Sequence, residues 1–157
     1  MSWSVEMVRI VRGLINDFGS PPSYSDERLQ ELLCTGAVLV LSEVAFSTAY
    51  TVSLSTFTIS PAPSADIDFQ ALVSLKTACI ISMGEHRHAA MRSITIKDGP
   101  SQIDNRDVAK HLLGLTKGVC DAYEKAKMNY LFGDGSVGRA IVGPYGVGMG
   151  QAETYRG

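Results

Sequence analysis

The last 25 residues of the chain, 133–157, contain eight of its fifteen glycines. Glycine leaves the backbone unrestricted and proline removes a hydrogen-bond donor, so a segment of this composition cannot continue a helix and forms strands poorly. The segment before it, about 105–132, has a strongly helical pattern. We therefore expect two parts, a helical body over 1–132 and an extended tail over 133–157.

The expected tail carries apolar side chains as well as glycines. Its candidate docking residues are Val137, Arg139, Ile141, Val142, Pro144 and Tyr145. Such residues are out of place in a purely solvating segment. An extended apolar segment can bury its side chains and pair its main chain with a partner edge, and arginine can bond a partner carboxylate. The tail predicts an assembly component that docks on its own body, a neighbouring copy or a different protein.

Length and charge limit the class of protein further. A chain of 157 residues has room for one domain with a real core. The formal net charge is −2, and Lys and Arg are scattered along the chain. A freestanding DNA-binding protein normally shows a basic patch, so this class is not expected.

Apolar residues recur at three- and four-residue steps in four segments, about 5–18, 25–44, 66–90 and 105–132, which predicts four helices. The expected apolar stripe of the first is Val5, Val8, Val11, Ile15 and Phe18, and the glycine and prolines of 19–22 end it. Ser25 is an N-cap candidate for the second helix. The third is apolar nearly all round and is therefore expected at the centre.

The fourth predicted helix has the stripe Val108, Leu112, Leu115, Val119, Ala122, Ala126 and Tyr130. The core residues that we expect across the helices are Leu29, Leu33, Val40, Leu72, Leu112 and Val119.

Alternating apolar residues predict strands over 51–59, with a bulge near 55–56, and over 93–97. Two isolated strands are marginal, and a neighbouring copy could complete them. The predicted fold is mainly α: a small bundle of about four helices, a minor two-stranded β element and the extended C-terminal tail.

The cysteines are odd in number and widely spaced. Cys34, Cys79 and Cys120 form no C-x-x-C pair, and the chain shows no signal-peptide pattern. We expect reduced, buried thiols in a cytosolic setting. No apolar run approaches the roughly 20 residues that span a bilayer, so no membrane partner is expected.

Two patterns resemble chemical sites. Gly133, Gly135 and Gly138 have the spacing G-x-G-x-x-G, but a helix precedes them where a dinucleotide site needs a strand. His86 and His88 lie two apart, so on a helix they point in different directions and cannot share one ion. We expect no catalytic residue, no metal site and no cofactor.

Several segments in order carry a family resemblance. They are the Pro-Pro break at 21–22, YSDERLQELL over 24–33, ISPAP over 59–63, DFQALVSLKTAC over 68–79, CDAYE over 120–124, FG over 132–133 and RAIVGPY over 139–145. Together they resemble the small neck proteins of tailed bacteriophages, the head–tail adaptor or head-completion family, especially those of marine cyanophages. The resemblance covers 24–145, and the glycine-rich end beyond Tyr145 departs from it.

The resemblance implies a structural virion protein rather than an enzyme. Such adaptors form a ring, usually of twelve copies, below the portal in the neck of the virion, and are assembled in the host cytoplasm. The implied partners are further copies of the chain, the portal protein and a tail or nozzle/terminator protein. Packaged double-stranded DNA passes the lumen without sequence-specific binding, which suits a near-neutral chain because basic contacts would grip phosphate.

Two alternatives stay open at this point. One is another phage tail-completion or assembly protein. The other is a small metal- or nucleotide-dependent enzyme.

Overall fold

The computed structural model of the protein describes residues 3–91, 95–98, 101–104 and 106–133, with side chains over 3–91 and 110–133. Its helices are α1 (Trp3–Ile15), α2 (Asp26–Glu43), α3 (Ile67–Met91) and α4 (Arg106–Phe132). Its strands are β1 (Thr51–Ser53), β2 (Thr58–Ser60), β3 (Thr95–Asp98) and β4 (Ser101–Asp104). The predicted fold class, mainly α with about four helices and a minor β element, is confirmed.

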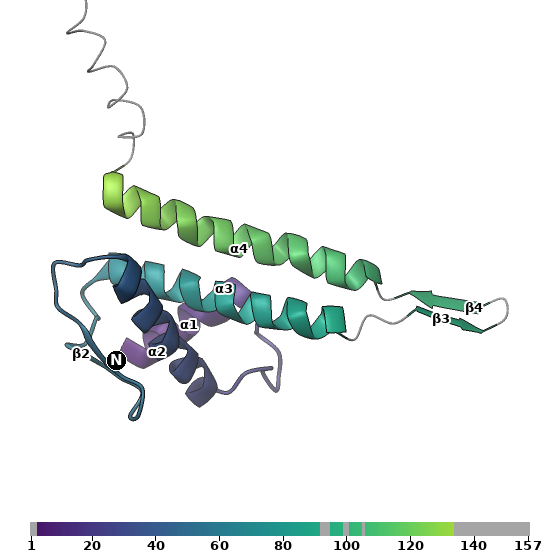
Figure 1. Cartoon of the computed structure of the whole chain (residues 1–157). Coiled ribbons are helices and arrows are strands. Elements are labelled where there is room, and N and C mark those ends of the chain that lie inside the picture. The colour runs from purple at the N-terminus through teal and green to yellow at the C-terminus, as the bar shows by residue number, and fades with distance from the viewer. Residues whose placement is uncertain (1–2, 92–94, 99–100, 105, 134–157) are drawn as a thin grey trace, which may run out of the picture.

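The helices are arranged around α3. Figure 1 shows α3 and α4 as a long antiparallel pair, with α1 and α2 on the side of α3 that faces away from α4. The placement follows from the sequence of α3, which is apolar nearly all round and so needs neighbours on several sides. The expectation that the third helix is central is confirmed.

The apolar core lies mainly where α1, α2 and α3 meet. Four of the predicted core residues are fully or almost fully buried there: Leu29, Leu33, Val40 and Leu72. They pack in one cluster with buried residues such as Met7, Val11, Phe69 and Val73.

The register of α1 differs from the expected stripe. Val8 and Val11 are buried as predicted, but Val5 is exposed and Phe18 is 71 % exposed, while Trp3 and Met7 take the inner face. The helix also ends earlier than the prolines, because Asn16 adopts a left-handed conformation with φ 56° and stops it after Ile15.

An arginine-centred cluster then fixes the corner between α1 and α2. Arg12 bonds the carboxylate of Asp17 at 2.8 Å, the carbonyl oxygen of Tyr24 at 2.8 Å and Asp26 at 2.6 Å. The backbone N–H of Ser23 donates to Asp17 and is the main cause of a lowered pKa of that carboxyl. The loop is thus held by directional bonds rather than by apolar burial.

The start of α2 confirms the predicted cap, because the Ser25 hydroxyl accepts a hydrogen bond from the N–H of Arg28. Further along, Gly36 lets α2 approach α3 closely. A Cβ atom at this position would lie 2.4 Å from Oγ1 of Thr77, a buried side chain that already donates to the Val73 carbonyl. Glycine is therefore required at position 36, because any side chain there would collide with Thr77.

Each predicted strand region is a hairpin. β1 pairs with β2 antiparallel, and the residues expected to form a bulge near 55–56 are part of the turn between them. β3 pairs with β4, so the strand expected over 93–97 has a second strand at 101–104 that the sequence did not reveal. The described strands therefore pair within the chain, and β3–β4 projects beyond the helices (Figure 1).

The register of α4 is also corrected. Among the side chains described from position 110 onward, the most buried are those of Tyr123, 1 % exposed, and Thr116. Leu112 and Val119, predicted as core, are only half-buried, and Leu115 is 60 % exposed. Because α4 packs chiefly on α3, the buried strip is narrow and has room for polar residues.

Candidate interaction surfaces

The tail begins where α4 ends. Gly133 has φ 72°, and its N–H donates to the carbonyl of Asn129 at 2.8 Å, which closes the last turn of the helix. The end predicted at Phe132 is confirmed. The docking candidates of the tail lie outside the described residues, namely Val137, Arg139, Ile141, Val142, Pro144 and Tyr145.

Apolar side chains surround this exit point. Met128, Leu131 and Phe132 are 44–53 % exposed on the last turns of α4. Ile67, 77 % exposed, begins α3, and the antiparallel arrangement brings that end of α3 toward the end of α4 (Figure 1). Clustered exposed apolar residues of this kind mark contact surfaces more often than isolated ones do.

An aromatic cluster holds this end of the molecule together. Tyr50 stacks on Phe69 with ring centroids 4.0 Å apart, and Phe46 contacts both Phe69 and Tyr130 at 5.2 and 5.1 Å. The hydroxyl of Tyr50 donates to Asp66, whose other carboxylate oxygen caps α3 by accepting from the N–H of Phe69. The cluster joins the segment after α2 to both long helices.

A polar network crosses the three helices α2, α3 and α4. Glu43 accepts hydrogen bonds from Lys76 at 2.7 Å and from Lys127 and the Tyr123 hydroxyl at 2.8 Å each. Both lysine ammonium groups also lie over the ring of Tyr123, at 4.5 and 5.2 Å from its centroid. Burial of Glu43 would raise its pKa, but these three donors outweigh that effect and hold the pKa at about 2.

The bonding of this network suits a structural role, in which it holds α2, α3 and α4 together. Its carboxylate stays ionised and accepts hydrogen bonds from three donors, two of them cationic, which leaves it a poor general base. Burial raises the pKa of Tyr123 far above its ordinary value, and the bond to Glu43 adds to the shift.

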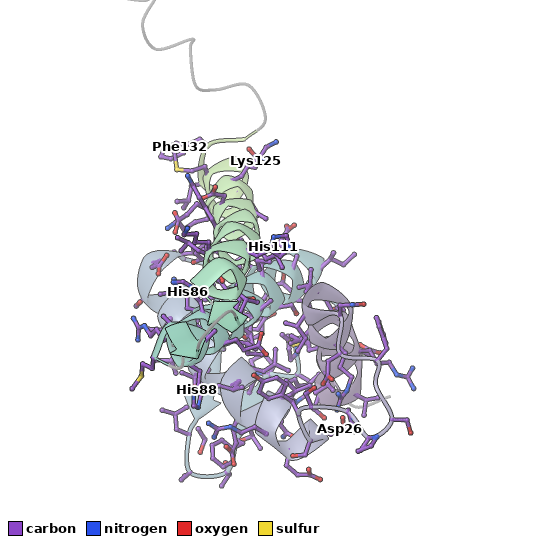
Figure 2. The ribbon with its side chains drawn as sticks, turned by 90° about the vertical axis from the view of Figure 1, so that its right-hand side faces the viewer. Asp26, His86, His88, His111, Lys125 and Phe132 are labelled. Carbon is purple, nitrogen blue, oxygen red and sulfur yellow. A yellow bond between two sulfur atoms is a disulfide. The ribbon has the colours of Figure 1, made fainter. Side chains whose placement is uncertain are left out.

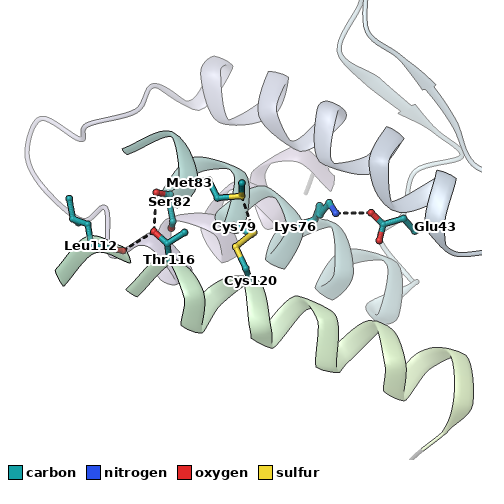
Figure 3. Close-up of a disulfide and its surroundings, with 8 residues drawn as sticks. All are labelled: Glu43, Lys76, Cys79, Ser82, Met83, Leu112, Thr116 and Cys120. Carbon is teal, nitrogen blue, oxygen red and sulfur yellow. Dashed lines mark hydrogen bonds and ion pairs between the residues drawn. A yellow bond between two sulfur atoms is a disulfide. The ribbon is translucent and has the colours of Figure 1, made fainter. Parts of the chain in front are cut away.

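A disulfide joins α3 to α4. Cys79 and Cys120 are bonded, with Cα atoms 4.9 Å apart, next to the Thr116 hydroxyl, which donates to the Ser82 carbonyl across the same two helices (Figure 3). The expectation of three reduced thiols is therefore wrong for this pair. The remaining thiol, Cys34, is buried, which raises its pKa to about 11.

The described residues of the two sequence patterns that resemble chemical sites do not come together into a site. His86 and His88 lie apart, and the third histidine of the chain, His111, is separate from both (Figure 2). Within the described ranges, no group of three or more His, Cys, Asp or Glu side chains could hold a metal ion. Gly133 is the one residue of the G-x-G-x-x-G pattern that is described, and it caps a helix end.

A groove lies between the end of α1, α3 and the N-terminal half of α4. Leu112 and Val119, the two predicted core residues that are not fully buried, line it together with Leu14 and Leu115. The acidic Glu85 lies at its side and accepts a hydrogen bond from the Tyr24 hydroxyl at 3.0 Å.

Sequence reasoning missed most of these contacts. The spacing of Tyr123 and Lys127, one turn apart, was the available signal for the polar network, but their partners Glu43 and Lys76 come from distant segments. For Cys79 and Cys120 no signal existed, because only the alignment of two antiparallel helices brings them together.

One described helix, α3, is long and apolar enough to cross a membrane. Of its apolar window, 44 % is buried inside the protein. A core helix passes the same test of length and composition, so this observation is weak support for a membrane span.

Comparisons with family models, with curated proteins and with solved structures found no match to this chain.

Proposed function

We propose that this protein is a structural, non-enzymatic component of a phage virion, a ring adaptor in the neck that joins the capsid portal to the tail. Its partners are further copies of itself, the portal protein and a tail or nozzle/terminator protein. The family is proposed from the sequence resemblance over 24–145, and rings in that family usually contain twelve copies. The observation that carries the proposal is the one-sided packing of α4.

Helix α4 has 27 residues and is therefore about 40 Å long. It packs chiefly on α3, and its outward residues include apolar ones: Leu113, Met128, Leu131 and Phe132 are 44–53 % exposed. A long helix with apolar residues on its free side is typical of a subunit contact. In a ring, each copy uses one surface to cover a different surface of the next copy, so such a helix is covered by the neighbour.

Charge supports the role of a conduit. The chain has 16 acidic and 14 basic residues, a balance that gives little general attraction for phosphate. Double-stranded DNA passing through the ring would then slide without being held, which is what packaging and ejection require.

The test is to purify the full chain and mix it with the portal protein from the same virus. Native mass spectrometry should show a closed ring, and electron microscopy should show that ring on the tail-facing side of the portal. A hexamer that does not bind the portal would favour the alternative of a tail-completion protein. A chain that stays monomeric and does not bind the portal would contradict the proposal.

A further inference from the structure

The groove between α1, α3 and α4 has the properties of a site for an apolar segment. It has a volume of about 300 Å³. Its lining residues are Leu14, Ile15, Asn16, Ser82, Glu85, Leu112, Leu115, Thr116 and Val119. Five of the nine are apolar, and two of these, Leu14 and Leu115, are 37 % and 60 % exposed. An apolar hollow with a few polar groups at its edge is suited to binding a short chain segment.

Glu85 is the one charged side chain among these described lining residues. Its exposed carboxylate already accepts one hydrogen bond, from the Tyr24 hydroxyl. A carboxylate has room for several donors, so a cationic side chain can bind beside the tyrosine. The groove therefore favours an occupant with apolar residues and one positive charge.

The segment 137–145 of this chain has that composition. Its sequence is VGRAIVGPY, with four large apolar or aromatic side chains and Arg139 as its one charged residue. We propose that this segment of one copy docks in the α1–α3–α4 groove of a second copy, with Arg139 bonded to Glu85. The proposal rests on the ring adaptor function and names the contact that closes the ring.

The length of the chain favours a second copy over the same copy. Thr116 bonds to Ser82 across the antiparallel helices (Figure 3). Glu85 is three residues further along α3, so it lies near the level of Leu112, which lines the same groove. Helix α4 runs from there to Phe132 for about 30 Å. Arg139 is seven residues beyond Phe132, which is at most about 25 Å of fully extended backbone. Only full extension of both the backbone and the arginine side chain would approach Glu85 of the same chain.

Docking between copies gives a head-to-tail contact, because the donor surface and the acceptor surface differ. Contacts of this type close into a ring when the rotation between copies is a whole fraction of a turn. Each added copy contributes one more segment–groove contact, so a weak single contact becomes strong in the closed ring.

The test is a charge swap on the full chain, with assembly measured by native mass spectrometry over a concentration series. Arg139→Glu and Glu85→Arg should each raise the concentration for half-assembly roughly tenfold or more, because like charges then meet in the groove. A mixture of the two variants should assemble again. In the mixture, the carboxylate introduced at position 139 meets the guanidinium introduced at position 85, and the native pair of Arg139 and Glu85 forms at the next contact. Complementary pairs therefore alternate around the ring.

Tyr24→Phe is the matched control, since it removes the hydrogen bond to Glu85 and keeps the carboxylate. It should assemble like the wild type, and circular dichroism should show all variants folded. Disruption by Tyr24→Phe equal to that by Glu85→Arg would overturn the proposal, as would a wild-type chain that stays monomeric. Assembly of both charge variants at the wild-type concentration would also overturn it.

Two further outcomes separate the alternatives. If the double variant within one chain restores assembly but the mixture of single variants does not, the segment docks on its own body and the proposal is wrong. If Arg139→Glu assembles normally but no longer binds the portal, the segment contacts the portal, and the adaptor function stands while this inference fails. If the charge-swap pattern holds and no variant binds the portal, the inference stands and the adaptor function fails.

Discussion

Two regions of the molecule are stabilised in different ways. The inner core, defined as the buried apolar residues of α1, α2 and α3, consists of fully covered side chains such as Leu33 and Phe69. The α3–α4 seam is defined as the Cys79–Cys120 disulfide, the Thr116–Ser82 bond and the network around Glu43. Apolar burial dominates the first region, and a few directional bonds dominate the second.

The difference shows how one helix can belong to a folded body and still keep a free surface. Because α4 is fixed by specific bonds along one narrow strip, its other sides do not need to be buried. Those sides carry the groove and the apolar residues near the tail exit. The comparison also predicts that redox state and pH act on the seam and leave the inner core largely untouched.

The largest expected effect is a cavity in the inner core. Leu33→Ala should lower the free energy of unfolding by about 2–5 kcal/mol, because Leu33 is fully buried. Leu112→Ala, at a half-buried position, should cost clearly less, and Leu115→Ala, at a 60 % exposed position, should stay within about 0.5 kcal/mol. Urea denaturation measures all three, and equal losses for Leu33 and Leu112 would contradict the division into two regions.

The second-largest expected effect on stability is that of losing the Cys79–Cys120 disulfide. Cys120→Ser opens a link between residues 41 positions apart and should lower stability by about 2–4 kcal/mol. Thermal unfolding with and without a phosphine reductant checks this, since the reductant should destabilise the wild type and leave Cys120→Ser unchanged. A thiol titration of the unfolded wild type that finds three free thiols would show that the disulfide is not formed.

A pair of glycine substitutions compares the regions directly. Gly36→Ala should destabilise by about 1–3 kcal/mol, because its Cβ would meet Thr77 Oγ1 at 2.4 Å in a packed interface. Gly118→Ala, on α4 where a Cβ meets nothing within 4 Å, should instead stabilise by about 0.5–1 kcal/mol. Melting temperatures that fall for both variants would mean that α4 is covered at this position.

The smallest expected effect is the pH response of the seam. The pKa of Glu43 is lowered from 4.5 to about 2, so its contribution is present above pH 4.5 and is lost as the pH falls toward 2. The group is partly exposed, so screening by solvent reduces the contribution to about 1 kcal/mol. Glu43→Gln should remove that part of the acid response. The pKa of Asp17 is also lowered, and Asp17 is present in both the wild type and Glu43→Gln, so some acid response remains in each. If stability depended on pH identically in the two proteins, the role of Glu43 would be contradicted.

Local signals in the sequence determined the elements of this fold. Ser25 and Asp66 carry the side-chain oxygens that cap α2 and α3, and Gly133 supplies the left-handed residue that ends α4. The all-round apolar pattern of α3 determined its central position. Caps depend on neighbouring residues in the chain, and an all-round apolar pattern indicates burial in general. Both signals can be recognised in the sequence without knowing which segment packs against the helix.

The register of the outer helices could not be predicted in the same way. In α1 and α4 several apolar stripes compete, and the choice depends on which neighbour each helix meets. The polar atoms of Tyr123 and Thr116 argue against burial in α4, yet both side chains have hydrogen-bond partners on other helices and are buried. Likewise, the hairpin partner of β3 carries little apolar pattern in the sequence SQID.

The sequence by itself determined four helices, the N-terminal caps of α2 and α3, most of the inner core and a glycine-rich tail that differs in composition from the body. The tertiary structure decided the Cys79–Cys120 pairing, the network around Glu43 and the groove beside Glu85. Each of these joins residues from separate helices, and the antiparallel alignment of α3 with α4 sets which ones face each other. Contacts across such distances depend on packing geometry, and no periodicity within one segment encodes it.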